Sequence, residues 1–135
     1  MRLWDISSRT AVTVLDRLSR SSNFHRVSRG GEFVTIGSYE GDFSVWRAGA
    51  GAMPVTLVGN AGPATDAQVT ANGKFLVTQS AWAVGIWDLQ ARRRLASFTA
   101  DGPFTRIAVE DRGTTLRIVA GDALGRVHWV TVNIA

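Results

Sequence analysis

The chain has 135 residues, of which 45% are hydrophobic and 19% charged, and its formal net charge is +4. This size and composition favour one globular domain and exclude a disordered chain. The sequence has no cysteine, which excludes disulfides, thiolate zinc sites and cysteine nucleophiles. No apolar run reaches the roughly 20 residues of a membrane span, and the first residues lack the apolar stretch of a secretory signal. We therefore expect a cytoplasmic protein.

Arginine supplies nearly all of the positive charge, and Lys74 is the single lysine. The cations are dispersed along the sequence, apart from the run 92–94. A nucleic-acid-binding protein more often gathers its basic residues on one face. The run itself lies between two expected strands, where a solvated hairpin turn is a simpler interpretation than a phosphate site.

Tryptophan-bearing segments recur at a nearly constant spacing. Trp46 follows Trp4 by 42 residues, and Trp87 follows Trp46 by 41. Val130 takes the fourth place, 43 residues after Trp87, when the glycines of the preceding turns are aligned. Such a period is the signature of a repeat architecture.

Each repeat contains short β-branched or aromatic segments bounded by polar, glycine-bearing turns, which is the pattern of antiparallel strands. Gly31, Gly73 and Gly113 lie in such turns and are expected at positive φ. The spacing of 11–18 also fits a short helix, and that alternative stays open. In chain order, the expected strands are 2–6, 10–15, 24–27, 33–38, 43–46, 54–58, 67–69, 75–78, 85–89, 94–98, 107–109, 116–120 and 127–132.

Four strands in about 42 residues is the content of a propeller blade. The approximate units are a half blade at 1–20 and blades at 21–60, 61–100 and 101–135, with two, four, four and three strands. Closed propellers have about 4–8 blades. We therefore predict an all-β chain of about three consecutive four-stranded antiparallel blades, an incomplete ring. It is either a piece of a longer propeller or one of several chains that complete a ring, and a first residue, Met1, inside a blade favours the piece.

These features make the chain resemble the WD-repeat family. The resemblance rests on Trp4-Asp5 and Trp87-Asp88 at strand ends, and on the turn 37–41 before the segment 43–46. It covers roughly 2–132 and implies a β-propeller that serves as a rigid scaffold for binding other proteins. The last unit resembles the final blade of propellers fused to bacterial signalling ATPases or kinases. This implies the C-terminal part of a larger signalling or regulatory protein.

The family also implies structural roles for particular residues. In it, a histidine, a turn acid, a serine and a tryptophan form a buried hydrogen-bonded set. Ser38, Glu40 and Trp46 match three of these positions, with Glu40 in place of the usual aspartate. Trp4 and Trp87 are the equivalent structural tryptophans of other units.

The sequence departs from the family pattern in two places. The glycine-histidine pair is replaced by glycine-proline at 62–63 and 102–103. In the unit 61–100, Ala81 and Trp82 replace the turn acid and glycine, so we expect no polar set around Trp87. That blade must then rely more on apolar packing.

By the same resemblance, partners bind the face near the start of each inner strand. Trp82 takes a turn position where most blades carry glycine, so its side chain either anchors an interface or fills a gap left by the missing polar set. The expected partner-binding residues are Asn23, Thr65, Asp66, Trp82, Thr105 and Arg106.

No residue pattern points to catalysis, a metal or a cofactor. His25 and His128 are the only histidines, and neither lies in a paired ligand motif. A hydrolase would need converging acids, and a structure that keeps Asp101 and Asp122 far from both histidines would remove that option. We expect a non-enzymatic protein-interaction scaffold without a cofactor. The alternative is a basic nucleic-acid-binding propeller, whose affinity would fall steeply with salt.

Overall fold

The structure of the chain is a computed structural model that describes residues 2–14, 22–49, 53–60 and 62–135. These residues form β-strands and no helix, so none of them belongs to a helix that could cross a membrane. The strands are β1 (Arg2–Asp5), β2 (Thr10–Val14), β3 (Ser22–Val27), β4 (Phe33–Ser38), β5 (Phe43–Arg47), β6 (Val55–Leu57), β7 (Ala64–Val69), β8 (Phe75–Ser80), β9 (Ala83–Asp88), β10 (Arg93–Thr99), β11 (Phe104–Asp111), β12 (Thr115–Asp122) and β13 (Val127–Asn133).

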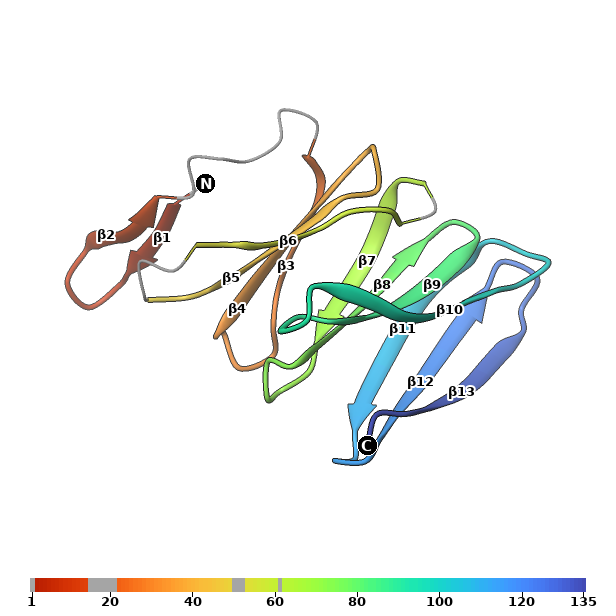
Figure 1. The fold of residues 1–135 in the computed structure, drawn as a ribbon. Helices are drawn as coiled ribbons and strands as arrows, with labels where there is room; N and C mark the ends of the chain where they lie inside the picture. Colours follow the sequence, from red (N-terminus) through yellow and green to blue (C-terminus); the bar gives the residue numbers. More distant parts are fainter. Residues whose placement is uncertain (1, 15–21, 50–52, 61) are drawn as a thin grey trace.

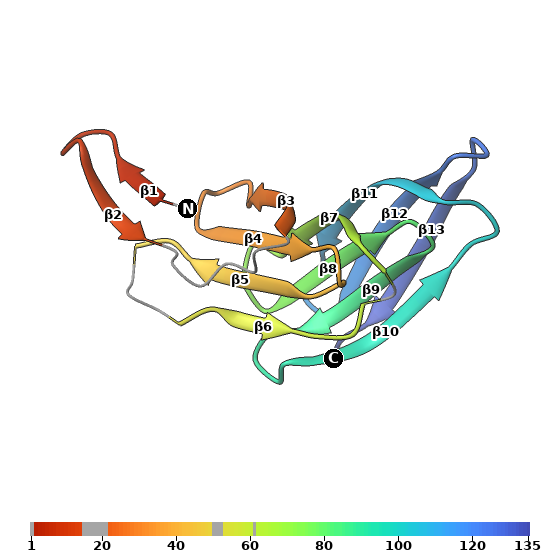
Figure 2. The same cartoon turned by 90° about the horizontal axis from the view of Figure 1, so that it is seen from above.

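The strands form four antiparallel sheets: the three larger ones stand face to face in a row, and the two-stranded sheet lies beside the first of them at the end of the row (Figures 1 and 2). We call them the hairpin (β1–β2), blade 1 (β3–β6), blade 2 (β7–β10) and blade 3 (β11–β13). Within each blade the strands follow one another in chain order, and the first strands β3, β7 and β11 are neighbours. This grouping of two, four, four and three strands in an open row confirms the predicted fold.

The strand pairing repeats the same register from blade to blade. Each first strand skips one residue in its pairing with the second strand, at Asn23, Thr65 and Thr105. The residue opposite the tryptophan position is also equivalent in the three blades. These pairs are Val34–Trp46, Leu76–Trp87 and Ile118–Val130. Val130 therefore occupies the tryptophan place of blade 3, as the spacing predicts.

The hairpin is equivalent to the outer half of blade 2. Trp4 and Trp87 hold the same position, and in both hairpins the pairing shifts by one residue directly before that tryptophan. Arg9 and Arg92 hold the same turn position, with positive φ angles of 54° and 53°. Residues 11–14 of the segment with a possible helix belong to β2, and residues 15–18 lie outside the described residues.

Most of the hydrophobic core lies between neighbouring blades. One cluster joins blade 1 to blade 2 and includes Phe43 and Leu76, both 0% exposed. A second joins blade 2 to blade 3 and includes Val84 and Ile118, also 0% exposed. Burying such a side chain contributes about 1.5–3 kcal/mol. Each blade is therefore stabilised by the face of its neighbour.

Blade 2 contains a polar set around its tryptophan. The Trp87 Nε1–H donates to Thr78 Oγ1 at 2.9 Å, and the Thr78 hydroxyl donates to Asn60 Oδ1 at 3.3 Å. All three residues are buried. The prediction that the unit 61–100 forms no such set is wrong, because Thr78 supplies the hydroxyl and Asn60 supplies an acceptor from the loop before β7.

Blade 1 has an apolar contact at the equivalent place. Ile36 holds the position of the threonine, and Trp46 packs against Ile36 and Val34. Ser38 lies two residues further along β4, where its Oγ accepts a hydrogen bond from the Asp42 amide at 3.1 Å. The predicted place of Ser38 beside the Trp46 indole is therefore corrected: Ser38 fixes the turn after β4.

The turns before the second strands follow the glycine prediction. Gly31, Gly73 and Gly113 have φ angles of 74°, 70° and 82°, a region that favours glycine. At Gly73 a second constraint applies, because a Cβ atom there would overlap the Phe33 ring of blade 1. This glycine therefore also sets how closely blades 1 and 2 approach.

Candidate functional site

The first strands begin at the same end of the blades as the turns between second and third strands. The pairing shows this directly, since the first residue of each inner strand pairs with the last residue of the next. These pairs are Ser22–Ser38, Ala64–Ser80 and Phe104–Asp122. We call this end of the molecule the turn face. All six residues predicted to bind a partner lie at this end.

One large apolar side chain projects from each turn of the turn face. Tyr39, Trp82 and Leu124 are 60%, 55% and 64% exposed. Trp82 is exposed, and the polar set around Trp87 is present in the same blade, so no gap is left for Trp82 to fill. The gap-filling interpretation is therefore ruled out. Tyr39 and Leu124 are missing from the sequence prediction, although they occupy the corresponding turns of the repeat. Glu40, beside Tyr39, is exposed as well, and its structural role stays a prediction.

A side-chain oxygen at the start of each turn holds its shape. Ser38 does so in blade 1, as described above. In blade 2, Ser80 Oγ accepts a hydrogen bond from the Ala83 amide at 3.2 Å, and in blade 3 Asp122 Oδ1 accepts one from the Arg126 amide at 3.0 Å. Such bonds replace a backbone turn bond and define the turn. The exposed apolar side chains therefore stand on ordered turns.

Asp122 is the centre of a charged cluster on the turn face. Its Oδ2 accepts a hydrogen bond from Arg126 Nε at 2.8 Å and lies 2.9 Å from His128 Nε2. Arg126 also reaches Asp101, at 3.5 Å. The hydrogen bonds from His128, from Arg126 and from the turn amides hold the pKa of Asp122 well below its usual value, against the opposing effect of burial.

This cluster bears on the hydrolase alternative. Asp122 contacts His128, and Arg126 links Asp122 to the exposed Asp101, so the separation that would have removed a hydrolase does not occur. However, the acceptor sites of Asp122 are occupied, and its pKa lies far from the neutral range that suits general acid-base catalysis. Among the described residues, no group of three His, Asp or Glu side chains is placed to hold a metal ion.

The depressed pKa of Asp122 makes stability depend on pH. Between the folded and unfolded pKa values the unfolded chain binds more protons, so the ionised carboxylate stabilises the fold above about pH 4 and this stabilisation is lost as the pH falls. We expect Asp122→Asn to flatten the decline in the free energy of unfolding below pH 4, measured by urea titration. Asp101→Asn, at an exposed side chain, is the control, and equal slopes for the two variants would contradict the prediction.

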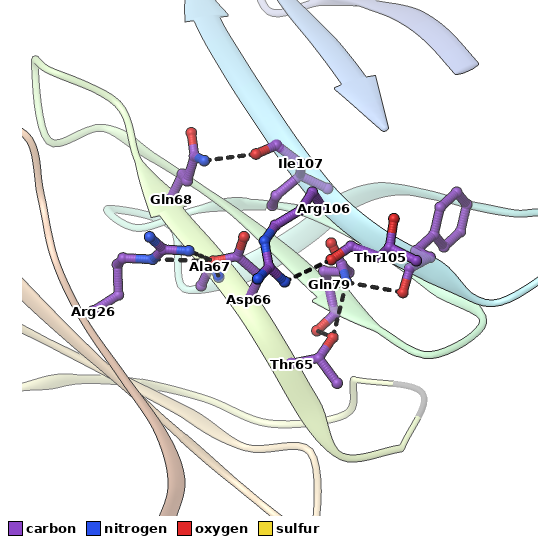
Figure 3. A network of polar contacts seen from close by, with 10 residues as sticks. Arg26, Thr65, Asp66, Ala67, Gln68, Gln79, Thr105, Arg106 and Ile107 are labelled. Carbon is purple, nitrogen blue, oxygen red and sulfur yellow. Dashed lines mark hydrogen bonds and ion pairs between the residues drawn. The ribbon is translucent and has the colours of Figure 1, made fainter. Parts of the chain in front are cut away.

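Two of the predicted binding residues take part in the hydrogen bonding at the boundaries between blades, Asn23 directly and Thr65 through Gln79. Asn23 Nδ2 donates to the Ala64 carbonyl of blade 2 at 2.8 Å. Thr65 Oγ1 accepts from Gln79 Nε2 at 3.0 Å, and the same amide donates to the Phe104 carbonyl of blade 3 at 3.1 Å (Figure 3). The bond of Asn23 joins β3 to β7, and the bond of Gln79 joins β8 to β11. The contribution of Asn23 and Thr65 to partner binding stays a prediction.

Asp66 is buried, with 1% of its surface exposed. Its Oδ1 accepts hydrogen bonds from the Arg26 side chain of blade 1 and from the Ala67 amide (Figure 3). The ion pair therefore joins β3 to β7. This burial corrects the prediction for Asp66, which has no surface to offer a partner.

Thr105 and Arg106 lie exposed at the start of β11. The Thr105 hydroxyl donates to the Gly121 carbonyl at 3.2 Å, and Arg106 Nη1 donates to the Thr105 carbonyl at 2.9 Å. In Figure 3 the Arg106 side chain extends from β11 towards β7. It places an exposed cation on the inner part of the turn face, where its role in binding stays a prediction.

The arginine run 92–94 lies away from the turn face, in the turn from β9 to β10 and at the start of β10. The Arg94 guanidinium donates to the Gly59 carbonyl at 3.1 Å and lies 5.7 Å from the centre of the Trp87 ring. The interpretation as a hairpin turn is confirmed, and Arg94 serves the packing of blade 2.

A cavity of about 690 Å³ lies towards the opposite ends of the inner strands. Its walls come from β3, β4, β7 and β11 and from the turns after β3 and β7, and they include Arg29, Phe33, Thr70 and Asp111. None of the predicted binding residues lines it. Its charged groups have both signs, so the lining does not select one class of ligand.

Comparison with known proteins supports the architecture. No family model matches the sequence, and no curated protein matches it. The β-propeller domain of Cps50 (Swd1) from Myceliophteria thermophila is similar in structure, with a TM-score of 0.62 and 19% identity over 85% of this chain and 40% of that chain. The computationally designed Ika4 protein has a TM-score of 0.73 and 19% identity, over 99% of this chain and 79% of that chain.

These likenesses show the fold. The chain consists of β-propeller blades. It spans less than half the length of the Cps50 propeller chain that it matches. At this level of identity the comparison carries the architecture and nothing about a partner.

Proposed function

We propose that the chain is a non-enzymatic protein-interaction scaffold and that its partner binds the turn face. The observation that carries this proposal is the row of exposed side chains Tyr39, Trp82 and Leu124, one on each blade. Aromatic residues on ordered backbone are frequent anchors of protein interfaces. Binding residues also commonly lie on loops that a rigid scaffold positions.

The resemblance to the WD-repeat family and the likeness to a propeller domain support the same kind of function. From the resemblance of blade 3 we further propose that the chain works in a bacterial, cytoplasmic signalling or regulatory protein. The low pKa and full hydrogen bonding of Asp122 support a structural role for the one cluster that joins acids to a histidine.

The test starts by capturing partners on the immobilised chain and identifying them by mass spectrometry, after which affinity is measured with the purified partner. Trp82→Ser is expected to weaken binding about 30-fold, because truncating a hot-spot aromatic costs about 2 kcal/mol or more. Arg29→Ala, exposed and far from the turn face, is the matched control and is expected to leave the affinity unchanged.

Two results would contradict the proposal. The first is that Trp82→Ser and Leu124→Ser both bind the partner as tightly as the unmodified chain does. The second is that the captured species is nucleic acid. In the second result, a steep fall of affinity with salt would establish the basic nucleic-acid-binding alternative.

A further inference from the structure

The exposed apolar side chains of the turn face stand on turns that are tied to one another. We call these side chains the apolar row: Tyr39, Trp82 and Leu124. The loop between β10 and β11 connects the turns of blades 2 and 3. Where it ends, the Phe104 amide donates to the Ala81 carbonyl at 2.7 Å, and the Ala123 amide donates to the Pro103 carbonyl at 2.8 Å. Backbone hydrogen bonds therefore hold these two turns at a fixed separation.

The surface between the members of the apolar row carries small and apolar residues. Leu124 lies over the buried Gly102, where a Cβ atom would come within 2.9 Å of the Leu124 Cγ atom. Pro103 follows and is half-buried, and Pro63 lies exposed in the loop between blades 1 and 2. The row therefore consists of projecting side chains above a low apolar floor.

The spacing of the apolar row follows from the spacing of the blades. Sheets that pack face to face lie about 10 Å apart, and the three turns hold corresponding positions in three such sheets. In an α-helix, residues seven apart lie on one side and are separated by about 10.5 Å along the axis. A helix surface also offers a hole between four side chains at this interval. Three projecting side chains thus match three successive holes of one helix.

Other backbone conformations of a partner match the row less well. An extended strand repeats the same face about every 6.8 Å. A polyproline II segment repeats about every 9.3 Å, but proline-rich segments bind in grooves lined by aromatic side chains. Here each side chain projects from a separate turn, and the third is Leu124. The row therefore favours a helix.

A positive charge borders the apolar row on its inner side. Because each blade runs from its inner to its outer strand, the exposed residues Thr65, Thr105 and Arg106 lie on this side. Arg106 carries the charge, and it donates to the uncharged Thr105 carbonyl. On the outer side, Asp101 and Arg126 form an ion pair at 3.5 Å and so present both signs. A partner with a carboxylate on its inner flank complements this pattern.

We propose that the partner of the turn face contributes an amphipathic α-helix of at least about 15 residues, which lies along the apolar row with an acidic residue facing Arg106. The apolar stripe of this helix packs around Tyr39, Trp82 and Leu124, and the helix runs from blade to blade. This inference rests on the proposed function of the turn face and names the class of the partner.

The experiment compares three fluorescently labelled synthetic peptides of about 18 residues. The first has leucines at the a and d positions of the heptad and glutamates along one flank. The second has the same composition with its leucines at alternate positions, and the third carries proline at every third position. Fluorescence anisotropy at physiological salt measures their dissociation constants with the full chain. The first peptide is expected to bind at least about 10-fold more tightly than the other two and to gain helix on binding, as measured by circular dichroism.

Variants of the chain locate the helix on the turn face. Trp82→Ser is expected to raise the dissociation constant of the first peptide about 30-fold. Arg106→Glu is expected to raise it about 5-fold, and to tighten the binding of a version with lysines in place of the glutamates. Lys74→Glu makes the same change in net charge at an exposed residue at the opposite end of blade 2. It is the matched control and is expected to leave both dissociation constants unchanged.

The outcomes separate this inference from the proposed function. If the alternating or the proline-rich peptide bound most tightly and Trp82→Ser still weakened it, the helix would be overturned and the proposed function would stand. The same holds if none of the peptides bound. Equal effects of Arg106→Glu and Lys74→Glu would overturn the acidic flank. Binding that neither Trp82→Ser nor Leu124→Ser weakens would overturn both the helix and the proposed function.

Discussion

Phe43→Ala is expected to lower the free energy of unfolding by about 3–5 kcal/mol, the usual range for deleting a buried phenylalanine from a core. Phe43 is 0% exposed and packs between blades 1 and 2, in the cluster that contains Ala64 and Leu76. Because the ring belongs to a shared face, its loss removes contacts from both blades. Domains of this size have about 5–15 kcal/mol of total stability, so the variant is expected to be partly or wholly unfolded at moderate temperature. Urea titration followed by tryptophan fluorescence measures the change.

The repeat itself supplies the control for this prediction. Val84 and Val127 hold the position of Phe43 in blades 2 and 3, but Val84 is 0% and Val127 59% exposed. Val84→Ala is expected to cost about 2 kcal/mol. Val127→Ala is expected to cost about 0.5 kcal/mol or less. Equal losses for the two valine variants would contradict the view that the core lies between blades.

The sequence allowed the fold to be predicted because the repeat has two independent markers. The tryptophan spacing gives the period, and the turn glycines give the phase within it. Together they placed Val130 in the tryptophan position of β13, and the pairing of Val130 with Ile118 confirms this. Strand order then follows, because consecutive strands joined by short turns pair antiparallel.

The same reasoning failed where a contact depends on the exact register around a turn. The turn of blade 2 is one residue shorter than that of blade 1, as the pairings Gln79–Val84 and Gly37–Phe43 show. The prediction also looked only at the turn residues, at Ser38 in blade 1 and at Ala81 in place of the acid in blade 2, and it passed over Thr78. The hydroxyl that faces the Trp87 indole belongs to Thr78, two residues before the turn residue Ser80. Its hydrogen-bond partner, Asn60, comes from the loop before β7, which the tryptophan spacing does not reveal.

The candidate site was predicted in part for a related reason. Trp82 stood out because a tryptophan in a glycine position is unusual, whereas Tyr39 and Leu124 attract no attention one at a time. Only the equivalence of the three turns reveals them as a row. Asp66 was assigned to the binding face because the family resemblance places partners near the start of each inner strand, but the ion pair with Arg26 of the preceding blade holds it in the interior.

The polar set of blade 2 provides the second large expected effect. Thr78→Val keeps the shape of the side chain and removes its hydroxyl, which leaves the buried Trp87 Nε1–H without its acceptor and Asn60 Oδ1 without its donor. An orphaned buried polar group costs about 1–3 kcal/mol, so the expected loss in the free energy of unfolding is about 2–4 kcal/mol. Urea denaturation at neutral pH measures it.

Thr78→Ser separates the hydroxyl from the packing. It keeps the acceptor for Trp87 and loses one methyl group, which costs about 1 kcal/mol, so the serine variant should be the more stable of the two. Blade 1 already has an apolar residue at this position, because Trp46 packs there against Ile36. If Thr78→Val were as stable as the unmodified chain, an apolar neighbour would suffice for either tryptophan. The polar set would then be a local substitution of one core contact by another, with no net contribution to the stability of blade 2.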